Sequence, residues 1–164
     1  MTTTEREERS RRPRKKRRHP LRWVVGLLAA ALGGWAWFQW QCWGLQVTQA
    51  EAALGRLPEG FDGYRIVHLS DLHGHEYGEG SEELLKLVRG QKPDLIVVTG
   101  DVIDQEGQLE IIPPLAKGLA AIAPSYYVTG NHEWSLGTGT VRELKGLLSQ
   151  CGVTPLSNQF EVLE

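Results

Sequence analysis

Residues 95–104 read Leu-Ile-Val-Val-Thr-Gly-Asp-Val-Ile-Asp, an apolar run that ends in a glycine and two carboxylates. Two other stretches follow the same plan. Residues 66–73 read Ile-Val-His-Leu-Ser-Asp-Leu-His, and residues 126–133 read Tyr-Tyr-Val-Thr-Gly-Asn-His-Glu. Each apolar run is typical of a buried strand, and polar residues that follow parallel strands gather at the carboxyl edge of the sheet. We therefore expect the polar residues of all three stretches at one edge.

The segments between these runs predict helices. One amphipathic helix is expected from Ser81 to Gly90, a second can start only near Pro114, and a third spans about residues 140–151. Alternating strands and helices are typical of an α/β fold with a parallel sheet and right-handed crossovers. Two outer strands are also expected, at residues 45–50 and around Phe160 and Val162. His68, inside a predicted strand, is expected to be a core histidine.

Residue types at the three strand ends suit divalent metal ions. Asp71 and His73 lie two residues apart and can hold one ion from two directions, and Asp101 follows a glycine that leaves its carboxylate free. Asn131 offers a neutral oxygen. Taken singly, each of these residues is more often a helix cap or a turn former. The three clusters together favour a metal site.

The pattern Asp-x-His, 26 residues, Gly-Asp-x-x-Asp, 25 residues, Gly-Asn-His-Glu resembles the calcineurin-like metallophosphoesterase family in order, spacing and strand context. The resemblance covers residues 64–133 as motif and 45–164 as fold. It implies the α/β/β/α sandwich of that family, of which this chain has the front half. The family pattern continues with a lone histidine and Gly-His-x-His, but no histidine follows His132. Residues 44–164 are thus expected to be the N-terminal part of a truncated domain.

The resemblance also implies residue roles. Two divalent ions, Mn, Fe or Zn, would be held by Asp71, His73, Asp101 and Asn131, with Asp101 bridging both. A hydroxide bound between the ions would attack phosphorus. His132 would be catalytic, facing the substrate phosphate, while Asp104 and Glu133 would orient ligands or His132 by hydrogen bonds. His75, in a glycine-rich loop, is a solvated residue by default, with substrate contact or a substitute ligand role as alternatives.

The N-terminal region differs from the rest of the chain. Residues 1–22 carry ten basic and three acidic side chains, whereas the remaining residues carry eight basic and seventeen acidic. Residues 23–43 are almost entirely apolar with tryptophans toward both ends, and about 20 such residues cross a bilayer as a helix. We expect a transmembrane helix or uncleaved signal anchor there, after a basic cytoplasmic tail over residues 1–22. Cleavage as a signal peptide and twin-arginine export stay open.

These observations predict a single-pass protein of the cell membrane whose domain lies outside the cytoplasm. Its expected function is metal-dependent phosphoester hydrolysis, as a phosphohydrolase or phosphodiesterase, on a substrate that is lipid-linked, nucleotide-linked or cell-wall-linked. The few ligands in this chain predict weak metal binding and little turnover. The alternative is a non-catalytic, membrane-anchored α/β binding module or relic that lacks the second half of the metal site. The acidic folded part argues against nucleic acid as a partner, and the oligomeric state is not indicated.

Overall fold

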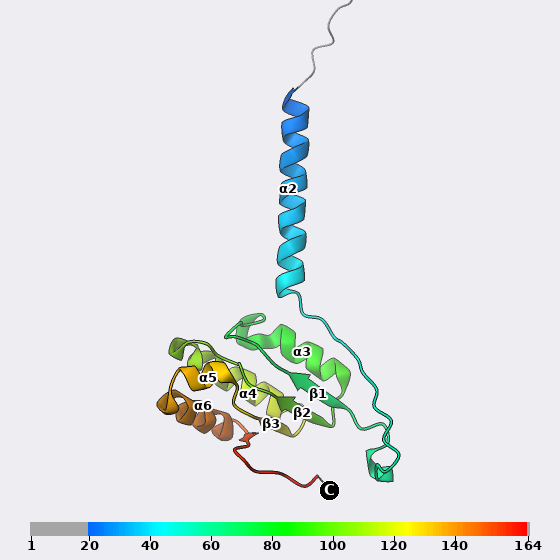
Figure 1. The fold of residues 1–164 in the computed structure, drawn as a ribbon, viewed down its shortest axis with the longest axis vertical. Helices are drawn as coiled ribbons and strands as arrows, with labels where there is room; N and C mark the ends of the chain where they lie inside the picture. Colours follow the sequence, from blue (N-terminus) through cyan, green and yellow to red (C-terminus); the bar gives the residue numbers. More distant parts are fainter. Residues whose placement is uncertain (1–19, 164) are drawn as a thin grey trace, which may run out of the picture. The chain divides into compact units, whose positions relative to one another are not determined.

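The computed structural model describes residues 20–163, which form two compact units that divide after Ala50. The first unit contains the helix α2, Pro20–Trp43 (Figure 1). Its segment Leu21–Phe38 is long and apolar enough to cross a membrane, and all of its side chains are exposed. A signal sequence would have the same properties. Most of the predicted basic tail, residues 1–19, lies outside the described residues.

The second unit is built on a sheet of four parallel strands, in the order β1-β2-β3-β4 (Figure 1). They are β1, Ile66–Leu69, β2, Leu95–Val98, β3, Ser125–Tyr127, and β4, Val153–Pro155. This confirms the predicted α/β fold with a parallel sheet. In register, Ile96 lies beside Ser125, and Ser125 beside Val153, and all three are buried.

The two predicted outer strands are wrong. Residues 45–50 have no regular structure, since alternating residues make a strand only where a partner strand accepts their hydrogen bonds. Phe160 and Val162 are 85% and 71% exposed and lie outside any strand. The last strand is β4 instead, which begins immediately after Gly152, where the backbone turns with a φ of 90°. β4 reads Val-Thr-Pro and so has no apolar run that would mark a buried strand in the sequence.

Three helices join the strands. They are α3, Glu82–Gln91, α4, Ile112–Ala120, and α6, Thr138–Gln150. The helix α4 begins two residues before the predicted Pro114, because Pro113 and Pro114 occupy its first turn, where backbone N–H groups have no partner within the helix. Shorter helical segments are η1, Glu59–Phe61, η2, Glu79–Ser81, η3, Glu106–Ile111, and α5, Asn131–Ser135.

The three joining helices lie on one face of the sheet. Right-handed crossovers between strands that follow each other in order place every connecting helix on the same side, and α4 contacts both α3 and α6. The opposite face is more open. Ile66 is 57% exposed, and His68, expected in the core, is exposed with its Nε2 2.6 Å from Thr99 Oγ1. That expectation for His68 is wrong because its strand position faces away from the helices.

Candidate metal centre

Backbone hydrogen bonds connect the loops that follow β1 and β2. The N–H of Asp71 donates to the carbonyl of Gly100 at 3.3 Å, and that of His73 to the carbonyl of Asp101 at 2.8 Å. A third bond runs from Gly74 to Val102 at 2.7 Å. The first two polar stretches therefore lie side by side at the carboxyl edge of the sheet.

The loops that follow β2 and β3 are in direct contact through two glycines. A Cβ atom on Gly100 would lie 2.2 Å from the backbone nitrogen of Gly130. A Cβ atom on Gly130 would lie 2.2 Å from Oδ1 of Asp101. Any side chain at either position would separate the loops. The glycine in each of these two motifs is thus needed for the close approach of the Asp101 and Asn131 segments.

Several ligand candidates have a left-handed backbone conformation. The φ angles of Asp71, His73 and Asp101 are 57°, 48° and 52°. This region is uncommon for residues other than glycine and costs about 1–3 kcal/mol for each residue. Such strain is characteristic of functional sites, where the surrounding structure imposes it. Here the backbone bonds between the loops impose it on His73 and Asp101.

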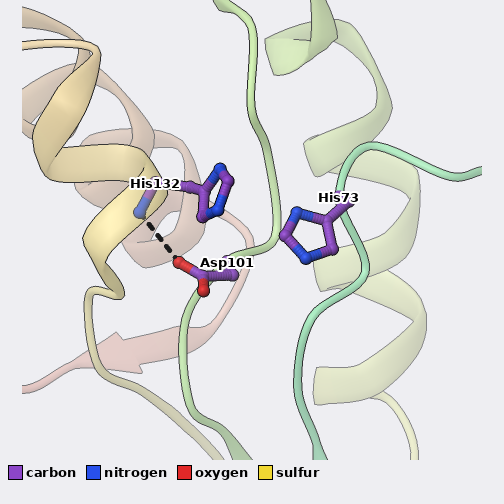
Figure 2. Close-up of side chains that lie close together, drawn as sticks. All are labelled: His73, Asp101 and His132. Carbon is purple, nitrogen blue, oxygen red and sulfur yellow. Dashed lines mark hydrogen bonds between the residues drawn. The ribbon is translucent and has the colours of Figure 1, made fainter.

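The structure brings His73, Asp101 and His132 together. One ligand atom from each residue lies within 4.8 Å of the other two, and Figure 2 shows the three side chains turned toward one another from separate segments. The two imidazole rings meet edge to face, with centroids 4.7 Å apart. A metal ion with bonds of about 2.0–2.2 Å separates its ligand atoms by at most about 4.4 Å. Small side-chain movements would therefore let this group hold an ion.

His73 lies between two carboxylates. Its Nε2 is 3.8 Å from Oδ1 of Asp71, and its Nδ1 is 3.6 Å from Oδ2 of Asp104. Both separations are longer than hydrogen bonds. The other oxygen of Asp104, Oδ1, is buried and has no hydrogen-bond partner among the described residues. A histidine that binds a metal through one ring nitrogen commonly has a carboxylate at the other nitrogen. Asp104 would have this place at Nδ1 of His73, so the residues fit an ion at Nε2, on the Asp71 side of the ring.

Glu133 is fully buried and joins the loops that follow β2 and β3. Its carboxylate accepts backbone hydrogen bonds from Gly130, Asp101, Val102 and Ile103, at 2.9, 3.0, 2.6 and 3.4 Å. The neighbouring N–H of His132 donates to Oδ1 of Asp101 at 2.9 Å. These bonds fix the distance between Asp101 and His132 before any ligand binds.

The remaining predicted residues lie around this cluster. Asn131 is the exposed first residue of α5. Asp71 is exposed, and its carboxylate accepts a hydrogen bond from the hydroxyl of Ser70. The ring of His75 meets the ring of Tyr77 edge to face, with centroids 4.5 Å apart.

Two residues beside the centre were not singled out from the sequence. Tyr127, at the end of β3, is fully buried, and its hydroxyl has no hydrogen bond of ordinary geometry among the described residues. Burial and the negative charges of Glu133 and Asp101 raise the pKa of Tyr127 above its ordinary range. Gln108 lies in η3 and contacts the His73 loop. No periodicity or motif in the sequence indicates either position.

Residues 64–161, more than half of the chain, match the family described as calcineurin-like phosphoesterase. The chain belongs to this family. The three polar stretches and the cluster of His73, Asp101 and His132 all lie within the matched residues. This match confirms the family predicted from the motifs.

Relatives with related names occur in bacteria and animals. The uncharacterized metallophosphoesterase YkuE of Bacillus subtilis is 32% identical over 157 residues, which cover 90% of this chain and 54% of that protein. A transmembrane protein with metallophosphoesterase domain from Bos taurus is 34% identical over 140 residues, 83% of this chain and 28% of that protein. The phosphodiesterase YaeI of Escherichia coli is 31% identical over 104 residues, 61% and 38% of the two chains. The chain spans about half of YkuE and less of the others.

Proposed function

We propose that this chain carries the ligands of a dinuclear metal centre that hydrolyses phosphoesters. The cluster of His73, Asp101 and His132 within 4.8 Å is the observation that carries the proposal. Nitrogen and carboxylate oxygen ligands suit Mn, Fe and Zn and do not decide among them. The chemistry that two bound ions supply is a lowered pKa of a shared water, which gives hydroxide as the nucleophile.

The proposed ligands are Asp71, His73, Asp101 and Asn131. Asp101 occupies the centre of the arrangement, between the His73 loop and the start of α5, which suits a carboxylate shared by two ions. Asp104 faces the Nδ1 side of His73 and would hold its ring in place. Glu133 would keep Asp101 and His132 in register through the backbone. Three grouped ligand atoms are few for two ions, so weak metal binding is part of the proposal.

His132 is proposed as the residue that donates a proton to the leaving oxygen or stabilises charge on the phosphate. It is half-buried, its backbone is fixed by Asp101, and its ring stays in reach of the metal cluster. The same position also permits a ligand role. Substitution separates the two roles, because loss of a ligand weakens metal binding, whereas loss of a proton donor slows hydrolysis at unchanged metal affinity.

The direct test uses the full chain in detergent micelles with Mn²⁺ and an aryl phosphodiester or phosphomonoester. Asp101→Asn should lower the Mn²⁺ affinity by about tenfold or more and remove the Mn²⁺-dependent hydrolysis. Glu143→Gln, an exposed change on α6, is the matched control and should leave both unchanged. Hydrolysis that persists without metal, or that survives Asp101→Asn, would contradict the proposal. Metal binding without any hydrolysis would favour the binding-module alternative.

We further propose that α2 anchors the domain to the cell membrane, with the N-terminus in the cytoplasm and residues 44–164 outside it. The excess of basic residues before α2 supports this orientation, and the name of the Bos taurus relative mentions a transmembrane protein. A domain held near a bilayer favours a lipid- or cell-wall-linked phosphoester as substrate. Tags at Met1 and Glu164 with protease treatment of spheroplasts test the orientation. Digestion of the Met1 tag alone would reverse it, and loss of that tag before treatment would indicate a cleaved signal.

A further inference from the structure

The side chain of Gln108 connects two segments of the metal centre. Its Oε1 accepts hydrogen bonds from the backbone N–H groups of Asp104, at 2.8 Å, and Gln105, at 3.1 Å. Its Nε2 donates to the backbone carbonyl of His73 at 3.4 Å. Asp104 and His73 are the two residues whose side chains face each other across 3.6 Å. One amide group thus contacts the backbone of both.

Gly74 provides the space for this contact. A Cβ atom at Gly74 would lie 2.0 Å from Cδ of Gln108 and 2.1 Å from its Nε2. The amide plane therefore lies directly against the backbone that follows His73. Gly74 also has a φ of 68°, in the left-handed region that favours glycine. Glycine at this position fits both the turn and the approach of Gln108.

A simpler role for Gln108 is to cap η3, since Gln105 is the residue that precedes this helical segment. That role uses only the bonds accepted by Oε1. It does not require the donor to the His73 carbonyl or the space at Gly74. The two roles therefore predict different results when the donor alone is removed.

We propose that Gln108 is a positioning residue that holds His73 in place relative to Asp104 and so raises the affinity of the centre for metal. This inference rests on the proposed function. The left-handed backbone at His73, with a φ of 48°, needs such support from its surroundings. Residues that orient a metal ligand affect metal affinity by about 10–100-fold.

The test compares Gln108→Glu with Gln91→Glu in the full chain in detergent micelles. Glutamate at position 108 keeps the acceptor for Asp104 and Gln105 but loses the donor and places an oxygen against the His73 carbonyl. Gln91 is the matched control, because its Nε2 donates to the carbonyl of Leu87, also at 3.4 Å, near the amino ends of the strands and not at the carboxyl edge. The added negative charge near the centre would by itself strengthen Mn²⁺ binding. A weaker affinity in Gln108→Glu therefore reports position and not charge.

We expect Gln108→Glu to weaken Mn²⁺ binding by about tenfold in calorimetric titration and to shift the ¹³C carbonyl resonance of His73 in the metal-free protein. Gln91→Glu should change neither. Gly74→Ala should act like Gln108→Glu. In the Gln108→Ala background its methyl group has room, so its further effect should fall to that of the backbone strain of alanine at a φ of 68°. If Gln108→Glu fails to fold, Gly74→Ala and the double variant Gly74→Ala/Gln108→Ala still test the inference.

Wild-type Mn²⁺ affinity together with an unshifted His73 resonance in Gln108→Glu would overturn the inference and leave only the capping role. A wild-type chain that binds no Mn²⁺ would contradict the proposed function instead. In that case the His73 resonance alone decides whether Gln108 positions this residue.

Discussion

At the residue scale, the carboxylate of Glu133 determines how two loops meet, because its four backbone partners come from both of them. The family resemblance implied that Glu133 orients ligands or His132. It did not indicate the partners, which lie about 30 residues away along the chain for three of the four bonds. Contacts of this kind depend on how β2 and β3 pair, so no local sequence pattern indicates them.

Replacing Glu133 should destabilise the fold strongly. Glu133→Ala leaves several buried N–H groups without acceptors and should cost about 3 kcal/mol or more of unfolding free energy. Glu133→Gln keeps one oxygen but turns an NH₂ group toward backbone donors, and should cost about 2 kcal/mol. Urea unfolding of the full chain in micelles, followed by circular dichroism, measures both. A loss below about 0.5 kcal/mol, the range of ordinary surface substitutions, would contradict the structure.

Burial of Tyr127 should make the folded protein less stable in alkaline solution. Its pKa is raised above the ordinary value of 10.0, chiefly by burial and then by the charge of Glu133. Above pH 10 the folded state therefore keeps a proton that the unfolded state releases, and stability falls as the pH rises, by at most about 1.4 kcal/mol per pH unit for one proton. Tyr127→Phe should reduce this slope above pH 10 while leaving the pH dependence near pH 8 unchanged. Identical alkaline slopes in thermal unfolding would exclude a buried neutral phenol.

At the element scale, the sequence predicted the parts of the fold that bury continuous apolar runs. β1, β2 and β3 were found within two residues of their observed bounds, as were the ends of α6. β4 and α5 were missed because they are short and have no apolar run. β4 reads Val-Thr-Pro, unlike the equally short β3, and the five residues of α5 make only about one and a half turns. The left-handed backbone at Asp71 and His73 was also not predicted, since only a few per cent of residues other than glycine adopt it, although Asp and His do so more often than most.

Two glycines within helices should respond in opposite ways to alanine. A Cβ atom on Gly118 of α4 would lie 2.3 Å from Cδ1 of Leu85, which is 8% exposed on α3 and has little room to move. A Cβ atom on Gly146 of α6 meets nothing within 4 Å. Gly118→Ala should therefore destabilise by about 1 kcal/mol despite the better helix propensity. Gly146→Ala should stabilise by about 0.5–1 kcal/mol. Equal effects in urea unfolding would show that α3 and α4 are not closely packed.

At the scale of the whole molecule, all three connecting helices lie on one face of the sheet, and the other face keeps apolar side chains accessible. Ile66 and Val128 are 57% and 40% exposed. Parallel sheets are normally covered on both faces, and exposed apolar patches promote association. The cluster of His73, Asp101 and His132 lies at the carboxyl edge between these two faces.

The open face should drive self-association. Ile66→Lys combined with Val128→Lys should lower the fraction of oligomers in sedimentation velocity in micelles, with an unfolding free energy within about 0.5 kcal/mol of wild type, as for other surface changes. Leu54→Lys, at a position 64% exposed outside the sheet, serves as the control for added charge. An equal reduction in both proteins would assign the effect to charge alone.

The backbone bonds that join the ligand loops have a consequence for how metal is captured. Because N–H groups of Asp71, His73 and Gly74 already pair with the neighbouring loop, the backbone around the proposed metal site is ordered without an ion, and chelators should not melt the domain. Ion exchange then requires side-chain rotation only. Under the proposed function, the supply of the ion would therefore set how much of the protein is loaded, without destroying and resynthesising the chain.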